Sequence, residues 1–283
     1  LYTQTRRILR ADIDAPMNRQ DMIASNKQSA RDLLAGDNGL ADIENLWDGL
    51  GEEYFLREVP SDIVWHSKAI MAHDEVQKQR TESEQPEPLI ILREHRELAL
   101  DAVQVFIYTH DQSNLFAVTM TVFDQMDLDV LDARVITASR DFALDSYVLL
   151  DRHGTLLTDT ERQTELIERL KQAFMSPTLP EVAQRRMPRQ LKHFHVPTKV
   201  SFSFNPQSNQ HMMILETLDQ PALLARVGQV FLAHDIEVHF ARITTLGERA
   251  EDMFFITDHE DKPLSHERLE KLKQALVETL NVS

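Results

Sequence analysis

The chain has 283 residues, which is enough for roughly two or three domains that each bury a core of their own. Its formal net charge of -16 repels nucleic-acid phosphates and anionic lipids, so the composition argues against nucleic-acid and membrane partners. The absence of cysteine excludes disulfides, thiolate nucleophiles and thiolate metal sites, and no apolar run approaches the roughly 20 residues of a membrane helix.

Residues 1–73 show no strand alternation and predict several helices. Pro16 suits the first position of a helix, and Gly36 and Gly39 mark a break. Because the chain begins without an initiator methionine, we interpret this segment as part of something longer. The composition then turns to Glu, Gln, Lys, Ser and Pro, so residues 74–100 are interpreted as a solvated linker. Apolar and aromatic residues give the helical segment a buried face: Trp47, Leu50, Tyr54, Phe55, Ile63 and Trp65.

Residues 101–175 predict a first small domain with strands and helices in alternation. The expected elements are strand Val103–Thr109, a helix through Leu115–Met126, strands Leu128–Ala138 and Phe142–Asp151, and helix Thr158–Phe174. The order β-α-β-β-α needs one more strand to complete a ferredoxin-like plan. Apolar residues alternate in 199–205, and this segment can supply the closing strand.

Residues 176–198 form a proline-rich linker in which the charge balance reverses. We expect its basic residues to lie against the acidic surface of the same chain, and contact with an anionic partner is the alternative. A second small domain follows in 210–283. Its expected elements are strand His211–Leu218, helix Pro221–Ala233, strands Ile236–Leu246 and Asp252–Asp258, and helix Ser265–Leu280.

The two small domains are copies of one module. Asp111–Thr137 aligns without a gap on Asp219–Thr245, and a slip of one residue then brings Ala143, Asp145 and Asp151 onto Ala250, Asp252 and Asp258. Two like modules are typical of a shared interface that binds a small ligand. The predicted fold class is α+β, with tandem ferredoxin-like βαββαβ modules after a helical segment.

The turns from first strand to helix are candidate binding sites, because a helix N-terminus presents free N–H groups to a carboxylate. The alternative is that Asp111 and Asp219 simply cap their helices. Asp129 and Glu237 open the second strand of each copy and would face the neighbouring module's turn. They are able to receive an ammonium group, and exposure to solvent is the alternative.

Other patterns are weaker. His-Asp dipeptides occur at His73, His110 and His234, but without the further ligands of a metal site, and His193-x-His195 lacks a carboxylate partner. Phosphate-binding glycine loops and nucleophile elbows are missing. RNA binding through a sheet would need exposed aromatics on a basic face. We therefore expect neither catalysis nor nucleic-acid binding from these residues.

The module resembles the ACT domain, whose signature turn is close to D-R-P-G-L-L and whose counterpart here is Asp219–Leu224. Further segments resemble the C-terminal part of the bifunctional uridylyltransferase/uridylyl-removing enzymes, which modify the PII signal protein. These segments are Tyr54–Arg57 with Pro60, Ile63, Trp65 and His66, then Leu131–Arg134, Phe142–Asp145, Arg189–Phe194 and Ala241–Asp252. The resemblance covers nearly the whole chain.

This resemblance implies that residues 1–73 end an HD-type domain and that the two ACT domains sense L-glutamine. The parent enzyme is expected to be cytoplasmic and to need a divalent metal such as Mg, whereas this fragment has neither active site and no cofactor. Implied partners are the upstream catalytic domains, PII and a second copy of the chain; a ligand-free docking or dimerisation module is the alternative. The implied binding residues are Asp111, Gln112, Ser113, Asn114, Leu115, Asp129, Asp219, Gln220, Pro221, Ala222, Leu223 and Glu237. Asn114 and Ala222 stand where the signature has glycine.

Overall fold

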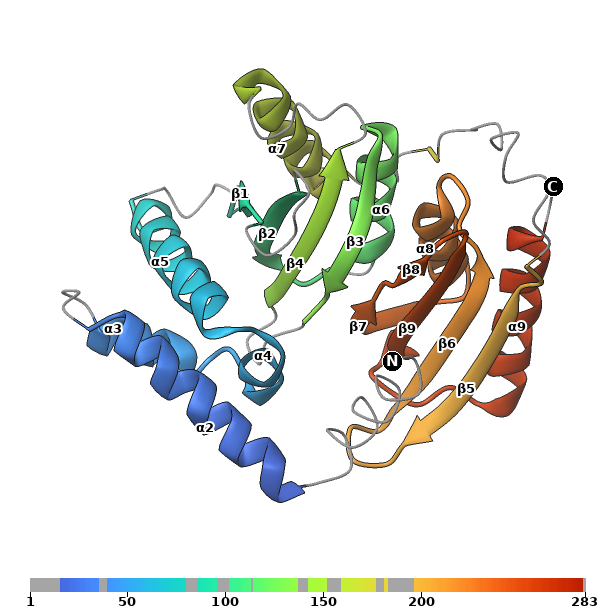
Figure 1. The fold of residues 1–283 in the computed structure, drawn as a ribbon, viewed down its shortest axis with the longest axis horizontal. Helices are drawn as coiled ribbons and strands as arrows, with labels where there is room; N and C mark the ends of the chain where they lie inside the picture. Colours follow the sequence, from blue (N-terminus) through green and yellow to red (C-terminus); the bar gives the residue numbers. More distant parts are fainter. Residues whose placement is uncertain are drawn as a thin grey trace. The chain divides into compact units, whose positions relative to one another are not determined.

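The computed structural model describes residues 16–35, 40–79, 86–95, 102–112, 114–136, 142–151, 159–176, 181–182 and 196–281. The chain divides into two compact units. One contains the N-terminal helices, and the other contains both strand-rich modules (Figure 1).

The described part of the N-terminal unit consists of helices around an aromatic core. They are α2 (Pro16–Leu33), α3 (Leu40–Trp47), α4 (Glu52–Arg57) and α5 (Pro60–Gln77). Inside it, the Trp47 Nε1–H donates to Ser67 Oγ at 2.8 Å, and the Tyr54 hydroxyl lies 3.0 Å from His66 Nδ1. These bonds satisfy polar groups that burial would otherwise make costly. Gly36 and Gly39 lie outside the described residues.

The first module carries a sheet of order β1-β2-β4-β3. Its elements are β1 (Leu89–Glu94), β2 (Ala102–His110), α6 (Leu115–Gln125), β3 (Leu128–Arg134), β4 (Phe142–Asp151) and α7 (Thr160–Met175). β2 is buried at every position before His110, as a central strand requires, and α6 packs against α7 and β3.

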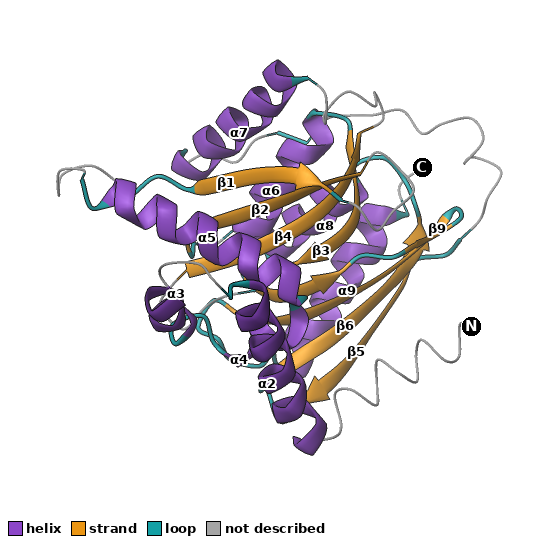
Figure 2. Cartoon of the chain, turned by 60° about the vertical axis from the view of Figure 1, so that its left-hand side comes forward, coloured by secondary structure: helices purple, strands orange, loops and turns teal. Residues whose placement is uncertain are grey.

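The second module repeats this plan with the order β5-β6-β9-β7, and a short strand β8 pairs with β9. Its elements are β5 (Lys199–Asn205), β6 (Gln210–Leu218), α8 (Leu223–Ala233), β7 (Ile236–Arg242), β8 (Thr245–Leu246), β9 (Arg249–Asp258) and α9 (His266–Leu280). Figure 2 shows the strands with α6, α8 and α9 behind them. Within this unit the apolar core runs continuously from one module into the other.

The α+β class, with helices followed by two antiparallel sheets, is confirmed. The expected source of the closing strand of the first module was wrong. β5 pairs with β6 of the second module and does not close the first, while β1 lies inside the expected linker 74–100 and forms the edge of the first sheet. Each module therefore runs ββαββα. A strand pairs most readily with its chain neighbour, because closing the short loop between them costs little entropy.

No helix in the described part of the chain is long and apolar enough to cross a membrane. Most of the basic linker 176–198 lies outside the described residues, including His193 and His195. Its expected contact with the acidic surface therefore stays a prediction.

Candidate functional site

The two modules pair through their helices α6 and α8. A Cβ at Gly228 would lie 2.8 Å from the Cα of Ala117, so the helices approach this closely because Gly228 has no side chain. Next to this contact the Phe116 ring lies 5.9 Å from that of Phe254 and 6.3 Å from that of Phe231, measured between centroids. The pairing brings the helix-leading turn of each module opposite the other module.

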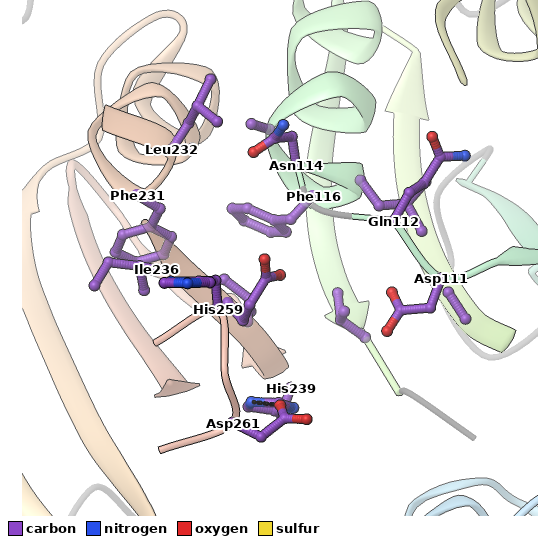
Figure 3. Close-up of a pocket in the computed structure, with 17 residues that line it drawn as sticks. Asp111, Gln112, Asn114, Phe116, Phe231, Leu232, Ile236, His239, His259 and Asp261 are labelled. Carbon is purple, nitrogen blue, oxygen red and sulfur yellow. Dashed lines mark ion pairs between the residues drawn. The ribbon is translucent and has the colours of Figure 1, made fainter. Parts of the chain in front are cut away.

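The first cavity, of about 200 Å³, lies between the turn of the first module and the start of β7 in the second. Figure 3 shows side chains of the two modules facing each other across it. Among its lining residues are Asp111, Gln112, Asn114 and Leu115 on one side and Glu237, His239, His259 and Asp261 on the other. Glu237 thus faces the neighbouring turn, as paired modules predict. Ser113 lies outside the described residues.

The second cavity, of about 310 Å³, has the converse construction. The turn of the second module faces the start of β3 in the first. Its lining includes Asp219, Gln220, Pro221, Ala222 and Leu223 together with Asp124, Asp127, Asp129 and Asp252. Both cavities lie near or below the lower end of the roughly 300–1,000 Å³ typical of drug-sized ligands, so each suits one small metabolite. Apart from Ser113, every predicted binding residue lines one cavity or the other.

The turns start their helices from a left-handed residue. Asn114 (φ 81°) is the N-cap of α6 and Ala222 (φ 59°) is the N-cap of α8, and neither makes a side-chain cap bond. The N-cap positions are thus Asn114 and Ala222, three residues after Asp111 and Asp219, and capping by the side chains of these aspartates stays a prediction. The positive φ values explain why a glycine suits this turn, since only glycine adopts them without steric cost.

The turns differ in what their glutamines do. Gln220 is buried, and its Nε2–H donates to the Leu280 carbonyl at 2.9 Å, which ties the second turn to the end of α9. The counterpart, Gln112, is exposed at the first cavity. The amide nitrogen of Gln220 is thus already hydrogen-bonded within the fold.

A buried aspartate lies on the central strand beneath each turn. Asp145 is 0% exposed and Asp252 is 1% exposed. Burial raises the pKa of Asp145 to about 7, against the lowering effect of the hydrogen bond from Tyr147. Burial raises the pKa of Asp252 to about 8, against the N–H of Thr244, which donates to its Oδ1 at 3.2 Å.

A histidine distinguishes the first cavity. His239 Nε2 lies 2.6 Å from Thr257 Oγ1 and 3.6 Å from Asp261 Oδ1. Burial lowers the pKa of His239, and the carboxylates of Asp261 and Asp111 oppose that effect. We call the contact between the two modules the seam. A neutral imidazole offers one donor and one acceptor there. The corresponding residue of the second cavity is Leu131, so the cavities share a plan and differ in polarity.

Sequence reasoning missed His239 and did not assign a role to Asp145 or Asp252. The signal for the aspartates was present, because both copies place an acid at the matching position of a predicted strand. His239 has no polar counterpart in the first module, so the repeat could not reveal it. Among the described residues, no group of three or more His, Asp or Glu side chains is arranged to hold a metal ion.

Comparison with known proteins gives closely similar relatives. The family model for the fifth domain of uridylyltransferase GlnD matches residues 18–69. The bifunctional uridylyltransferase/uridylyl-removing enzyme of Psychrobacter cryohalolentis is 63% identical and aligns over 100% of this chain and 31% of the relative. That of Acinetobacter baumannii is 48% identical over 99% of this chain and 31% of the relative. The chain thus spans about a third of the length of these curated relatives, and the resemblance inferred from its sequence is confirmed.

Among solved structures, aspartate kinase from Synechocystis aligns with 63% of this chain and 27% of that chain, with a TM-score of 0.35 and 14% sequence identity. A similarity this low carries no argument.

Proposed function

This chain matches, along its whole length, the C-terminal 31% of the bifunctional uridylyltransferase/uridylyl-removing enzymes, and from that premise we propose that its paired modules sense glutamine. The observation that carries the proposal is the pair of seam cavities. Each is built from the helix-leading turn of one module and the acidic strand start of the other. An occupant of either cavity would touch both modules at once.

The residues lining the cavities suit an amino acid. The α-carboxylate would accept hydrogen bonds from the N–H groups of the first turn of α6 or α8, which have no acceptor within their own helix. The ammonium group would lie near Glu237 in the first cavity or Asp129 in the second, since both side chains line their cavities. Backbone hydrogen bonds would bind the side-chain carboxamide. With these contacts, few polar groups of the bound amino acid would lack a hydrogen-bond partner.

Regulation would follow from the position of the cavities at the seam. A ligand that binds one pairing of the modules better than another shifts the population toward that pairing. A coupling free energy of about 1–3 kcal/mol is enough to change affinities roughly 5- to 150-fold. We propose that this shift biases the upstream catalytic domains of the cytoplasmic parent enzyme between adding UMP to PII and removing it.

The direct test is isothermal calorimetry on the 283-residue chain with glutamine, glutamate and asparagine. We expect glutamine to bind and the other two to bind at least about tenfold more weakly. Equal or absent heats for all three would contradict the sensor role and favour the alternative, a ligand-free docking or dimerisation module.

Bulky substitutions locate the binding. Asn114→Phe should fill the first cavity and Ala222→Leu the second, and each should remove one glutamine site. Gln229→Leu is the matched control, because Gln229 is an exposed residue of α8 that lines neither cavity. Circular dichroism would establish that each variant is folded. Unchanged glutamine binding in both cavity variants would place the ligand elsewhere.

A further inference from the structure

Asp252 has one carboxyl oxygen committed and one without a partner. Its Oδ1 accepts the backbone N–H of Thr244 at 3.2 Å, whereas its Oδ2 is buried and makes no hydrogen bond. The side chain belongs to the lining of the second cavity. A buried polar atom without a partner costs about 1–3 kcal/mol, so such an atom at a cavity points to a ligand that pairs with it.

The matching aspartate of the first module, Asp145, has a different partner for its engaged oxygen. In the first module the Tyr147 hydroxyl donates to Asp145 Oδ2 at 3.0 Å. The residue at the matching position in the second module is Phe254, which has no hydroxyl. Asp145 does not line the first cavity. Both aspartates thus keep one buried oxygen without a hydrogen bond, Asp145 Oδ1 and Asp252 Oδ2, and of these two residues it is Asp252 that lines one of the two cavities.

The surroundings of Asp252 decide its charge. The ionisable side chains lining the second cavity are all aspartates: Asp124, Asp127, Asp129, Asp219 and Asp252. Glu251, beside it on β9, adds a further negative charge. Burial, followed by the charges of Asp219 and Glu251, raises the pKa of Asp252 to about 8. At neutral pH it is therefore mostly a neutral carboxylic acid, with an O–H to donate and a carbonyl oxygen to accept.

We propose that Asp252 recognises the side-chain carboxamide of glutamine in the second cavity and thereby selects glutamine over glutamate. A carboxylic acid and a primary carboxamide are complementary, because each has one donor beside one acceptor. A ligand carboxylate at the same position would add negative charge among four other aspartates and would meet repulsion. The inference rests on the proposed glutamine sensing and assigns to a side chain a contact otherwise left to the backbone.

The test is calorimetry of glutamine and glutamate binding to the 283-residue chain between pH 6.5 and pH 9, fitted with two sites. The first cavity serves as an internal control, because Asp252 does not line it. In the unsubstituted chain the second site should keep its glutamine affinity up to about pH 8. It should then lose about tenfold by pH 9, because binding uses the protonated acid.

Two substitutions separate recognition from structure. Asp252→Asn keeps a donor beside an acceptor, so its affinity should stay within about threefold and its decline above pH 8 should disappear. Asp252→Ala should weaken glutamine at the second site at least about tenfold and erase the preference over glutamate. Asp145→Asn and Asp145→Ala are matched controls, equally buried and outside both cavities, and should leave binding unchanged. Glutamine's own amino group titrates equally with both proteins, so subtracting the pH profile of Asp252→Asn from that of the parent removes its contribution.

The carbonyl band of a protonated carboxylic acid gives an independent readout. Infrared difference spectra at pH 7 should contain such a band that Asp252→Asn removes and that glutamine shifts. Affinity that rises through pH 8 would indicate contact with the ligand ammonium and would overturn the inference while leaving glutamine sensing intact. Asp252→Asn behaving like Asp252→Ala would also overturn it. Absence of glutamine heat at every pH would overturn the proposed function together with it.

Discussion

Asn114 and Ala222 hold the same left-handed backbone conformation with different side chains. Asparagine tolerates this conformation comparatively well, whereas for alanine it costs about 1–2 kcal/mol. The signature turn that this segment resembles has glycine here. A sequence can therefore depart from a motif while the backbone keeps the geometry that the motif encodes, at a cost in stability.

Replacing Ala222 by glycine should raise the free energy of unfolding by about 0.5–1 kcal/mol. The relief of steric strain exceeds the entropy that glycine adds to the unfolded chain. Asn114→Gly should change stability less. Urea denaturation of the three proteins would measure the differences, and a destabilised Ala222→Gly variant would show that the alanine is not strained.

The buried aspartates make stability depend on pH in an unusual direction. The folded chain keeps the protons of Asp145 and Asp252 up to about pH 7 and 8, while the unfolded chain releases them near pH 4. The unfolded state thus binds fewer protons over this interval. The free energy of unfolding should fall with rising pH by about 1.4 kcal/mol per unit for each aspartate, with no further loss above pH 8.

Urea denaturation between pH 4 and pH 9 tests this dependence. Subtracting the curves of Asp145→Asn and Asp252→Asn isolates each contribution from carboxylates of opposite behaviour, such as Asp258. Burial acts to raise the pKa of Asp258, but hydrogen bonds from the Lys262 and Glu260 backbone and the charges of Arg268 and His259 together lower it. Each asparagine variant should be more stable than the parent at pH 8 and similar near pH 4. If the free energies of unfolding of the parent and of the asparagine variants changed in parallel with pH, the aspartates would be ionised in the folded protein.

At the scale of elements, the contact between α6 and α8 sets the distance between the modules. Gly228 and Ala117 meet there on the side of the first cavity, and Met120 and Ala225 are the matching pair on the side of the second. The small residues bring the helices close beside the first cavity, which is the smaller one, and the larger Met120 lines the second. This difference accompanies the unequal volumes of the two cavities.

Gly228→Ala should destabilise the chain by about 1–3 kcal/mol. In an ordinary helix this change gains about 0.8–1.0 kcal/mol, but here the new methyl group would meet the backbone of Ala117 at 2.8 Å and push the helices apart. Gln229→Ala, at the next and exposed position, should be neutral or slightly stabilising. Thermal unfolding of both variants gives the comparison. A Gly228→Ala variant that is more stable than the parent would show that α6 and α8 move apart at little cost.

For the whole molecule, the net charge of -16 sets a background of repulsion. Charge of one sign disfavours the compact state, and the range of that repulsion falls from about 30 Å in 0.01 M salt to about 3 Å in 1 M salt. The stability of such a chain therefore depends on ionic strength.

Raising sodium chloride from about 0.01 M to about 0.5 M should raise the melting temperature by a few degrees at pH 8, because screening removes long-range repulsion. Near the sequence pI of about 5.1 the same salt should have much less effect. Calorimetric scans at both pH values would test this, and an equal rise at both would assign the effect to salt acting on the apolar surface.

Local patterns by themselves determined the repeated elements and the turn and strand-start residues that line the cavities. Alternation at Phe142–Asp151 and helical spacing from Leu115 depend on near neighbours in the chain, so the sequence contains them directly. Since cavity-lining residues here sit at strand starts and helix starts, locating those boundaries also located Glu237 and Ala222.

Only the tertiary structure decided what depends on distant partners. The alternation in Lys199–Asn205 identifies a strand, but its pairing with β6 was settled by the hairpin that joins them. The protonation of Asp252 is set by burial under atoms from many segments, and Phe254 lacks the hydroxyl with which Tyr147 binds Asp145. Desolvation and strand pairing are sums over the whole fold, which is why two copies of one sequence pattern acquired different chemistry.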